Sequence, residues 1–321
     1  MKKLKVLLLF DNPYSRPRGY DYKEEFKDFD WGAESDIYDA LCDSGHEVRL
    51  LGLHNSIKPL IEEIEQERPD IIFNQVEVFN QTAELDKSVA ALLELTGVPY
   101  TGCSPSCLMI CGDKALTKTI LRYHRIKVPR FYTYYRHRRV WLPKRLRLPL
   151  IVKPLREEAS RGISQASIVD SEETLIERVK MIHETMKKDA IVEEYIEGRE
   201  FYVSVIGNKR ITVLPLREMK FGDLKNEEHR IATYKAKWDA DYRERWGIKN
   251  VFAGRIPEGM EERIADVCKR AYRALGMDSY GRFDIRLTPE GKIFIIEANA
   301  NPNLDTSDEV AQSAEKADIA Y

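Results

Sequence analysis

The sequence predicts an α/β protein with more than one domain. Its first third alternates short apolar runs with amphipathic segments, which is the pattern of a doubly wound sheet of parallel strands connected by helices. Later apolar runs follow one another across short turns, which indicates antiparallel strands. With 321 residues, of which 43% are hydrophobic, the chain is long enough to bury the cores of two or three domains.

The N-terminal elements follow from the spacing of the apolar residues. Lys5–Phe10 is a short apolar run, as expected of a strand buried on both faces. Further strands are expected at 46–53, 70–74 and 98–101, with helices at 34–44, 58–67 and 84–95. The stretch 11–31 mixes aromatic and charged residues without a clear period, so we interpret it as a functional loop or lid. Because Gly-x-Gly-x-x-Gly is absent after the first strand, no dinucleotide site is expected there.

A second region opens near residue 104. Cys103, Cys107 and Cys111 recur every fourth residue. We interpret them as small residues on a packed helix face, because a zinc or iron–sulfur site needs closer pairs or a fourth ligand nearby. Asp113 then predicts the start of a helix, since its side chain is a suitable N-cap.

Neither nucleic acid nor a membrane is expected as a partner. The stretch 136–147 is basic and contains Trp141, a combination found in nucleic-acid sites, but it is short and interrupted by proline in a chain of 51 basic and 53 acidic residues. We interpret it as a solvated linker. The N-terminus resembles a signal peptide only superficially, because its apolar run is short and no small-residue cleavage site follows. The protein is expected to be soluble and cytoplasmic, since no apolar run approaches the length of a membrane span.

Charged residues at the ends of two apolar strands need partners. Lys153 closes one strand, which is unfavourable unless its ammonium group faces an anion. The polar loop after it contains Ser160 and Gly162, and both a phosphate-covering loop and a surface hairpin are consistent with it. In a later strand, Glu193 and Glu194 point to opposite faces, so one of them lies against the packed face or lines a cleft.

The C-terminal part predicts two antiparallel strands around a cluster of oxygen ligands. Asp284 and Glu297 each lie in a strongly apolar strand, where an unpaired carboxylate is unfavourable. Asn299 shares a strand face with Glu297, and the three side chains together suit Mg²⁺. The alternative is that each acid pairs with an arginine, for which Arg282 and Arg286 are nearby in the sequence.

Seven short motifs occur along the chain in a characteristic order. They are Pro99-Tyr-Thr-Gly, Asp113-Lys-x-x-Thr-Lys, Ile151-Val-Lys-Pro, Val192-Glu-Glu-Tyr-Ile-x-Gly-Arg-Glu-Phe, Tyr234-Lys-Ala-Lys, Arg282-Phe-Asp and Glu297-Ala-Asn-x-Asn-Pro. This order resembles that of the ATP-grasp ligases, and within that superfamily the chain most resembles the D-alanine–D-alanine ligases. The resemblance runs from Lys5 to the end of the chain and is densest after the first motif.

The resemblance implies a three-domain ATP-grasp architecture of the α/β class. Its parts are an N-terminal doubly wound domain at 1–103, and two α+β domains that enclose ATP, a central one at 104–193 and a C-terminal one with the metal site at 194–321. In the implied reaction a carboxylate attacks the γ-phosphate of ATP, and an amine opens the resulting acyl phosphate to an amide. The implied partners are ATP, Mg²⁺ (two ions, with Mn²⁺ as an alternative) and small carboxylate and amine substrates such as amino acids. The implied assembly is a homodimer formed through the N-terminal domain.

Individual roles are implied where residues match the motifs of the family. The phosphate contacts would be Lys114, Lys153, Lys237 and the loop residues Ser160 and Gly162. The adenine and ribose contacts would be Glu193, Tyr195, Ile196 and Glu200. The metal ligands would be Asp284, Glu297 and Asn299, and Arg282 would stabilise the oxyanion of the tetrahedral intermediate.

The departures from the family concern the amino-acid side of the site. A His-Gly-x-x-Gly-Glu-Asp-Gly motif is missing from 73–86, while Ala159, Trp238 and Asp308 stand where the family has serine, tyrosine and serine. Glu34 is a candidate for the family's N-terminal glutamate. The substrate pair therefore need not be two D-alanines: Asp308 would repel a carboxylate, and a cationic amine as acceptor would suit it. Two alternatives stay open: a macromolecular acceptor, and an inactive nucleotide-binding regulator, which the metal ligands disfavour.

Overall fold

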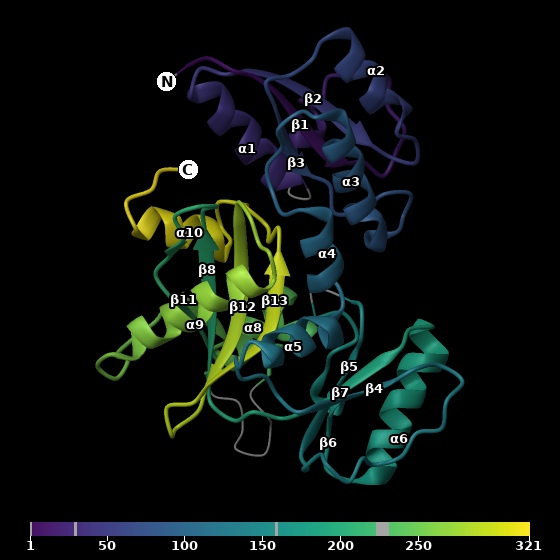
Figure 1. Ribbon diagram of the computed structural model, residues 1–321, viewed down its shortest axis with the longest axis vertical. Helices are drawn as coiled ribbons and strands as arrows, with labels where there is room; N and C mark the ends of the chain where they lie inside the picture. The colour runs from purple at the N-terminus through teal and green to yellow at the C-terminus, as the bar shows by residue number, and fades with distance from the viewer. Residues whose placement is uncertain (1, 29–30, 158–159, 223–230) are drawn as a thin grey trace.

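The computed structural model describes residues 2–28, 31–157, 160–222 and 231–321. Within them the chain forms three β-sheets (Figure 1). The first sheet lies at the end of the molecule that carries the N-terminus, and the second and third lie toward the opposite end. This arrangement leaves the second and third sheets as neighbours, and the functional residues gather between them.

The first sheet is parallel and has the strand order β2-β1-β3. Its elements in chain order are β1 (Lys5–Asp11), α1 (Gly32–Asp43), β2 (Glu47–Leu53), α2 (Lys58–Gln66), β3 (Ile71–Gln75) and α3 (Asp86–Thr96). The central strand is buried on both faces, as predicted: Leu7 and Leu9 pack with α2 and α3, whereas Leu8 and Phe10 pack with α1. The doubly wound arrangement is therefore confirmed.

The fourth strand predicted at 98–101 is wrong. Only a single parallel bridge joins Ile72 to Tyr100. The reason is local chemistry: Gly97 ends α3 in the left-handed conformation with φ 63°, and Pro99 has no N–H group to donate to a ladder.

The aromatic stretch 11–31 is largely irregular, as expected, but its described part is not a lid. Tyr22 is buried, and its ring lies 5.0 Å from that of Phe10 in an edge-to-face arrangement. Phe26 and Trp31 pack against the same rings. These aromatic residues therefore form the core between β1 and α1 and do not cover a cleft.

Two helices lead from the first sheet to the second, α4 (Pro105–Cys111) and α5 (Lys114–Tyr123). The predicted N-cap is confirmed, because the Asp113 carboxylate accepts hydrogen bonds of 3.0 Å from two backbone N–H groups of the first turn of α5. Cys103 and Cys107 are buried in the largest hydrophobic core, which confirms that they are packing residues.

The second sheet is antiparallel, with the order β4-β7-β5-β6. Its elements are β4 (Phe131–Tyr134), β5 (Leu150–Pro154), β6 (Ile168–Val169), α6 (Glu172–Met181), a π-helical turn (Ile182–Met186) and β7 (Ala190–Glu194). The helix packs on one face, where Val179 and Val152 share a core, and the opposite face carries Lys153 and Glu193. The basic stretch 136–147 connects β4 to β5, two strands of this sheet, and is mostly exposed and irregular, which agrees with its interpretation as a solvated linker.

The third sheet has the strand order β11-β10-β8-β12-β13, with β9 paired to β8, and its pairs are antiparallel. Its elements are β8 (Arg199–Ile206), β9 (Thr212–Val213), β10 (Arg217–Lys220), α7 (Tyr234–Trp238), α8 (Ala240–Trp246), β11 (Lys249–Phe252), α9 (Met260–Ala274), β12 (Tyr280–Leu287), β13 (Ile293–Ala300) and α10 (Glu309–Lys316). Phe201 and Phe283 face the core with α9. Because strand residues alternate, Glu200, Tyr202 and Asp284 face the opposite side. One face of the third sheet thus packs against the hydrophobic core, and the other face carries the polar side chains of the candidate site.

The described part of the chain contains no helix that is both long and apolar enough to cross a bilayer.

The cap of α5 can be tested by substitution. Asp113→Ala should lower the free energy of unfolding by about 1 kcal/mol, because two N–H groups of the helix lose their acceptor. Asp113 also pairs with Arg156 at 3.0 Å, an exposed ion pair of little expected value. Asp113→Ser is the control, since it removes the ion pair and keeps a capping oxygen. In urea titrations, the free energy of unfolding of Asp113→Ser should be close to that of wild type. Equal losses of stability in Asp113→Ser and Asp113→Ala would instead assign the effect to the ion pair with Arg156.

Candidate active site

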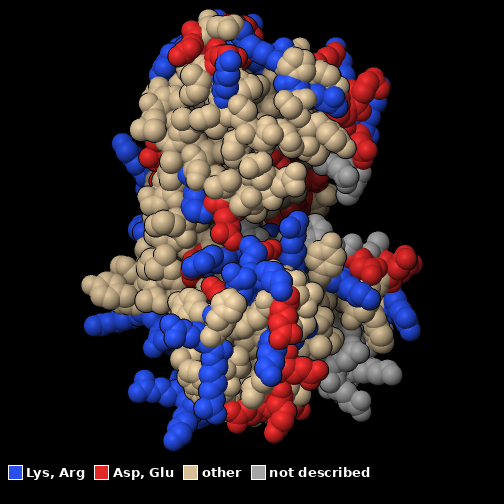
Figure 2. Space-filling model, turned by 90° about the vertical axis from the view of Figure 1, so that its right-hand side faces the viewer, with Lys and Arg blue, Asp and Glu red and all other residues tan. Residues whose placement is uncertain are grey.

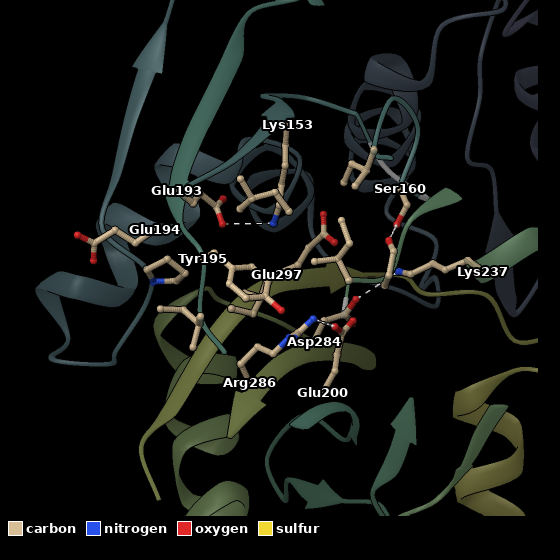
Figure 3. A pocket seen from close by; sticks show the side chains of 17 residues that line it. Lys153, Ser160, Glu193, Glu194, Tyr195, Glu200, Lys237, Asp284, Arg286 and Glu297 are labelled. Atoms are coloured by element: carbon tan, nitrogen blue, oxygen red, sulfur yellow. Dashed lines mark hydrogen bonds and ion pairs between the residues drawn. The ribbon is translucent and has the colours of Figure 1, made fainter. Parts of the chain in front are cut away.

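The candidate site is a cleft between the second and third sheets, closed by the loop around residue 160 and by α7 (Figure 3). The sequence-predicted residues that line it are Lys153, Ser160, Glu193, Tyr195, Ile196, Glu200, Lys237, Asp284 and Glu297. Lys114, Arg282 and Asn299 reach the cleft through contacts with these residues. Gly162 is outside the lining, and a β-carbon at its position would lie 2.7 Å from the sulfur of Met186.

A buried ion triad stands at the centre of the site. The Glu193 carboxylate lies 3.0 Å from Nζ of Lys118 and 3.2 Å from Nζ of Lys153, and all three residues are buried. Burial alone would raise the pKa of Glu193, but the two ammonium groups outweigh it and hold that pKa below its ordinary value. Burial in turn lowers the pKa of Lys118, which Glu193 opposes. The triad thus links α5 by side-chain contacts to β5 and β7, which are neighbouring strands of the second sheet.

Lys118 is a functional residue that the sequence analysis did not assign. Its Nζ also donates a hydrogen bond to the Ile296 carbonyl on β13, so it connects the second and third sheets across the cleft. The signal was present in the motif that begins at Asp113, because Lys118 is four residues from Lys114 and hence on the same helix face.

The predicted metal ligands meet as expected of neighbouring strands. Asp284 and Glu297 are directly opposite one another on β12 and β13, and the Asn299 amide donates to Asp284 at 3.2 Å. Among the described residues, no three His, Cys, Asp or Glu side chains come together in a way that could hold a metal. The donors available here are the carboxylates of Asp284 and Glu297 and the amide of Asn299. Hard oxygen donors of this kind fit Mg²⁺ or Mn²⁺.

Each of these carboxylates also has a cationic partner. Nε of Arg282 lies 2.9 Å from Asp284, and Nζ of Lys114 lies 3.0 Å from Glu297. Burial would raise the pKa of Glu297, but Lys114 and nearby lysines hold it below its ordinary value. The alternative of pairing with arginine thus holds for Asp284 but not for Glu297, and Arg286 pairs with Glu200.

Arg282, the predicted oxyanion residue, has a second carboxylate partner that the sequence analysis missed. Glu309, in the first turn of α10, accepts from Nη1 of Arg282 at 2.9 Å and also from the Asn250 amide. Burial would raise the pKa of Glu309, but Arg282 overcomes it and lowers that pKa to about 2. Neighbouring Asp308 is the N-cap of α10, and burial together with Glu309 raises its pKa to about 8.

The nucleotide side of the cleft is held by polar contacts of the lining. Glu194 points away from Glu193, as predicted, and accepts from the Arg147 backbone. Ser160 donates to the Ala232 carbonyl at 2.9 Å, which fixes the loop against the chain before α7. Of the departures noted in the sequence, Ala159 lies outside the described residues, and Trp238 belongs to α7 without a described side chain.

An acidic corner lies where α1 of the first sheet meets the loop before α10. Asp36 accepts from the backbone and hydroxyl of Thr306 at 3.0 and 2.7 Å, which holds the two segments together. Burial, followed by the charges of Asp11 and Asp305, raises the pKa of Glu34 to about 7. Glu34 therefore titrates near neutral pH.

The triad can be tested by removing one lysine. Lys118→Met should lower the free energy of unfolding by about 3–5 kcal/mol, because Glu193 loses one of two buried partners. The double variant Lys118→Met/Glu193→Gln is the control and should recover part of the loss, since it no longer buries an underpaired carboxylate. Urea unfolding measures both; a Lys118→Met variant as stable as wild type would contradict the role of the triad.

The acidic corner predicts a pH dependence. Glu34 has a folded pKa of about 7 against an ordinary value of 4.5, so folding favours its protonated form. Its stabilising contribution is present below pH 4.5 and is lost as the pH rises through 7, by up to about 3 kcal/mol. Glu34→Gln should therefore gain stability relative to wild type as the pH rises from 5 to 8. Chemical denaturation across this range measures it, and parallel curves for the two proteins would contradict the assignment.

Comparison with known proteins agrees with this geometry. Residues 123–321 match the family model described as D-ala D-ala ligase C-terminus. An uncharacterized protein, y4sG, of Sinorhizobium fredii is 31% identical over 88% of this chain and 82% of its own length. A D-alanine–D-alanine ligase of Bordetella petrii is 29% identical over 74% of this chain and 68% of its own.

Solved structures share the fold. The D-alanine–D-alanine ligase of Bacillus anthracis complexed with ATP has a TM-score of 0.73 and 21% identity, covering 99% of this chain and 93% of that one. The VanG D-Ala:D-Ser ligase of Enterococcus faecalis has a TM-score of 0.70 and 18% identity, covering 99% and 96%. The family match, the relatives and the fold agree with the cleft described above, and the chain belongs to the D-alanine–D-alanine ligase family of ATP-grasp ligases.

Proposed function

We propose that this ATP-dependent carboxylate–amine ligase joins substrates of which at least the acceptor is not D-alanine. The observation that carries the proposal is the start of α10, where Asp308 caps the helix and Glu309 pairs with Arg282. The ionised Glu309 carboxylate, together with the Asp308 carboxyl group and its raised pKa of about 8, thus stands where the family resemblance places the acceptor's own carboxylate. A cationic amine without an unshielded carboxylate fits this end of the site better than an ordinary amino acid does.

The reaction forms an amide in two steps. The donor carboxylate oxygen attacks the γ-phosphorus, the bond from that phosphorus to the bridging oxygen breaks, and ADP leaves. The acceptor nitrogen then attacks the carbonyl carbon of the acyl phosphate, the C–O bond to phosphate breaks, and the nitrogen loses a proton. The chain must therefore neutralise phosphate charge in the first step and an oxyanion in the second.

The residues of the cleft are placed for both requirements. Lys114, Lys153 and Lys237 approach from α5, β5 and α7 and would neutralise the phosphate oxygens. Asp284 and Glu297, with the Asn299 amide, would hold Mg²⁺, which supplies charge neutralisation and orientation of the phosphates when bound. The same acids pair with these cations, so binding of phosphate and metal would exchange one set of ionic partners for another.

Arg282 is the residue that would act on the oxyanion. Its guanidinium lies 5.1 Å over the Tyr202 ring and is fixed by Asp284 and Glu309. A planar group held at two of its nitrogens keeps a remaining N–H direction for a developing negative charge. Glu193, Tyr195 and Ile196 at the end of β7 would contact adenine, and Glu200 the ribose, as the resemblance implies.

Several finer features belong to the same proposal. They are the domain boundaries near residues 103 and 193, two Mg²⁺ ions with Mn²⁺ as an alternative, amino-acid-type substrates and a homodimer formed through the first sheet and its helices. The support for them is the family resemblance. The alternative of an inactive regulator is disfavoured because the metal ligands lie together and face the lysines.

The test is phosphate release from ATP and Mg²⁺, measured first with D-alanine and then with pools of amino acids and polyamines. We expect release with a pool that contains cationic amines, an amide product by mass spectrometry, and loss of at least a hundredfold in Glu297→Ala. Asp308→Ser should move the preference toward acceptors with a free carboxylate. A D-alanine dipeptide formed at full rate by wild type would contradict the proposed acceptor, and ATP binding without release in every pool would favour a macromolecular acceptor or a regulator.

A further inference from the structure

A second concave site lies on the second sheet's far side from the cleft. It is a groove of about 720 Å³ between the loop after β4 and the flank of α6 with its π-helical turn, and we call it the basic groove. Its described lining contains five Lys or Arg residues and a single acid, Glu184. The five are Arg136, Arg138, Arg139, Lys180 and Lys187. Figure 2 shows the face of the molecule that carries α6, where many Lys and Arg side chains gather in the lower half.

The cations of the basic groove stand out because they lack partners. Among the described residues, none of the five has a carboxylate within 4.0 Å. The chain as a whole has 51 basic and 53 acidic residues, so this is a local excess. Like charges gathered in one concavity repel one another, and the groove focuses their field on whatever enters it.

The backbone around the groove has unusual geometry at several points. Two lining residues, His137 and Lys187, adopt the left-handed conformation, with φ 65° and 57°. The turn Ile182–Met186 is π-helical, a conformation that is rare and frequent at functional sites. Lys187 is the C-cap of this turn, a position where the left-handed conformation is common. The π-helical turn and the charge therefore point to the same place.

The backbone of the groove is also preorganised. The Arg136 N–H donates to the Asp189 carboxylate at 2.9 Å, which anchors the loop beside β7. A ring nitrogen of His183 lies 3.0 Å from the Tyr134 carbonyl, which anchors the π-helical turn to β4. The backbone of both walls is thus fixed by contacts to the sheet, whereas the five Lys and Arg side chains are exposed and would be ordered by the ligand.

We propose that the basic groove binds a compact polyphosphate, either free or as part of a nucleotide. Five cations against one acid leave an excess of four positive charges, which matches a short phosphate chain. Three of the five are arginines, whose planar fork suits phosphate oxygens. The volume is that of a site for a small ligand.

Larger polyanions fit the groove less well. Single-stranded nucleic acid is usually held by basic residues together with Phe, Tyr or Trp rings on which bases stack, and the described lining has none of these. The exposed rings of Tyr132 and Trp141 pack on each other at 5.5 Å beside the edge strand β4 and do not belong to the lining. A membrane would require an apolar rim, and the apolar members of the lining are Val140 and Ile176.

The test uses the full chain and inorganic tripolyphosphate without Mg²⁺. Isothermal titration compares wild type with Arg138→Glu/Arg139→Glu, and the control is Lys144→Glu/Arg145→Glu, an equal charge change in the same loop outside the groove. We expect at least tenfold weaker binding in the groove variant and less than twofold in the control. Amide hydrogen exchange should slow at 136–140 and 176–187 on binding, which separates the groove from the nucleotide cleft.

The possible sources of the phosphate chain are separated by a second arm. Equal protection of the groove by tripolyphosphate and ATP would identify the phosphates as the recognised group, and stronger protection by ATP would identify a nucleotide. Equal loss of binding in both variants, or protection confined to the cleft, would overturn the proposal. Tighter groove binding by a single-stranded oligonucleotide than by tripolyphosphate would also overturn it. None of these readouts requires ligase activity.

Discussion

The fold around the cleft depends on the buried contact of Glu193 with Lys118 and Lys153. Three charged groups taken out of water carry a desolvation penalty, and a well-packed apolar replacement is often as stable or more stable. Stability alone therefore does not explain the triad. The triad instead positions two side chains. Lys118 donates a hydrogen bond to the Ile296 carbonyl on β13, and Lys153 is held at the edge of the cleft. The triad sets the spacing of the two sheets that enclose the nucleotide.

The same principle extends along the floor of the cleft. Glu297 faces Lys114, Asp284 faces Arg282, and Glu200 faces Arg286, so the acids that a divalent cation and a ribose need are already compensated. An uncompensated carboxylate at these depths would shift its pKa upward and lose its charge. Lys114 and nearby lysines hold the pKa of Glu297 below its ordinary value, whereas at Asp284 burial outweighs Arg282 and raises the pKa. A bound cation would offset the burial of Asp284 and favour its charged form.

The sequence predicted what depends on periodicity and failed where tertiary contacts decide. The doubly buried strand β1 and the opposed pair Asp284 and Glu297 follow from apolar runs and strand alternation, which are local signals. The strand at 98–101 failed because one proline removes a ladder donor. Glu309 and its partner Asn250 were missed because they reach the site from distant elements, α10 and β11, and no spacing in the sequence links them. Lys118 was within reach, but a buried lysine on a helix gives no sign of its partner until the fold is known.

On the proposed function, the start of α10 is the part of the site that limits the second substrate. The N-terminus of a helix carries a partial positive charge and free N–H groups, which normally makes it an anion site. Here the chain supplies its own acidic side chains: Asp308, whose pKa is raised to about 8, accepts from the Glu309 backbone, and the ionised Glu309 pairs with Arg282. On the proposed function, an acceptor carboxylate would have to displace one of them and then remain beside the other. An acceptor that brings a positive charge would instead add a cation beside Glu309, which Arg282 and Lys237 already stabilise. The amino-acid side of this ligase thus differs from the family where charge matters most, while its nucleotide side keeps the family's pattern.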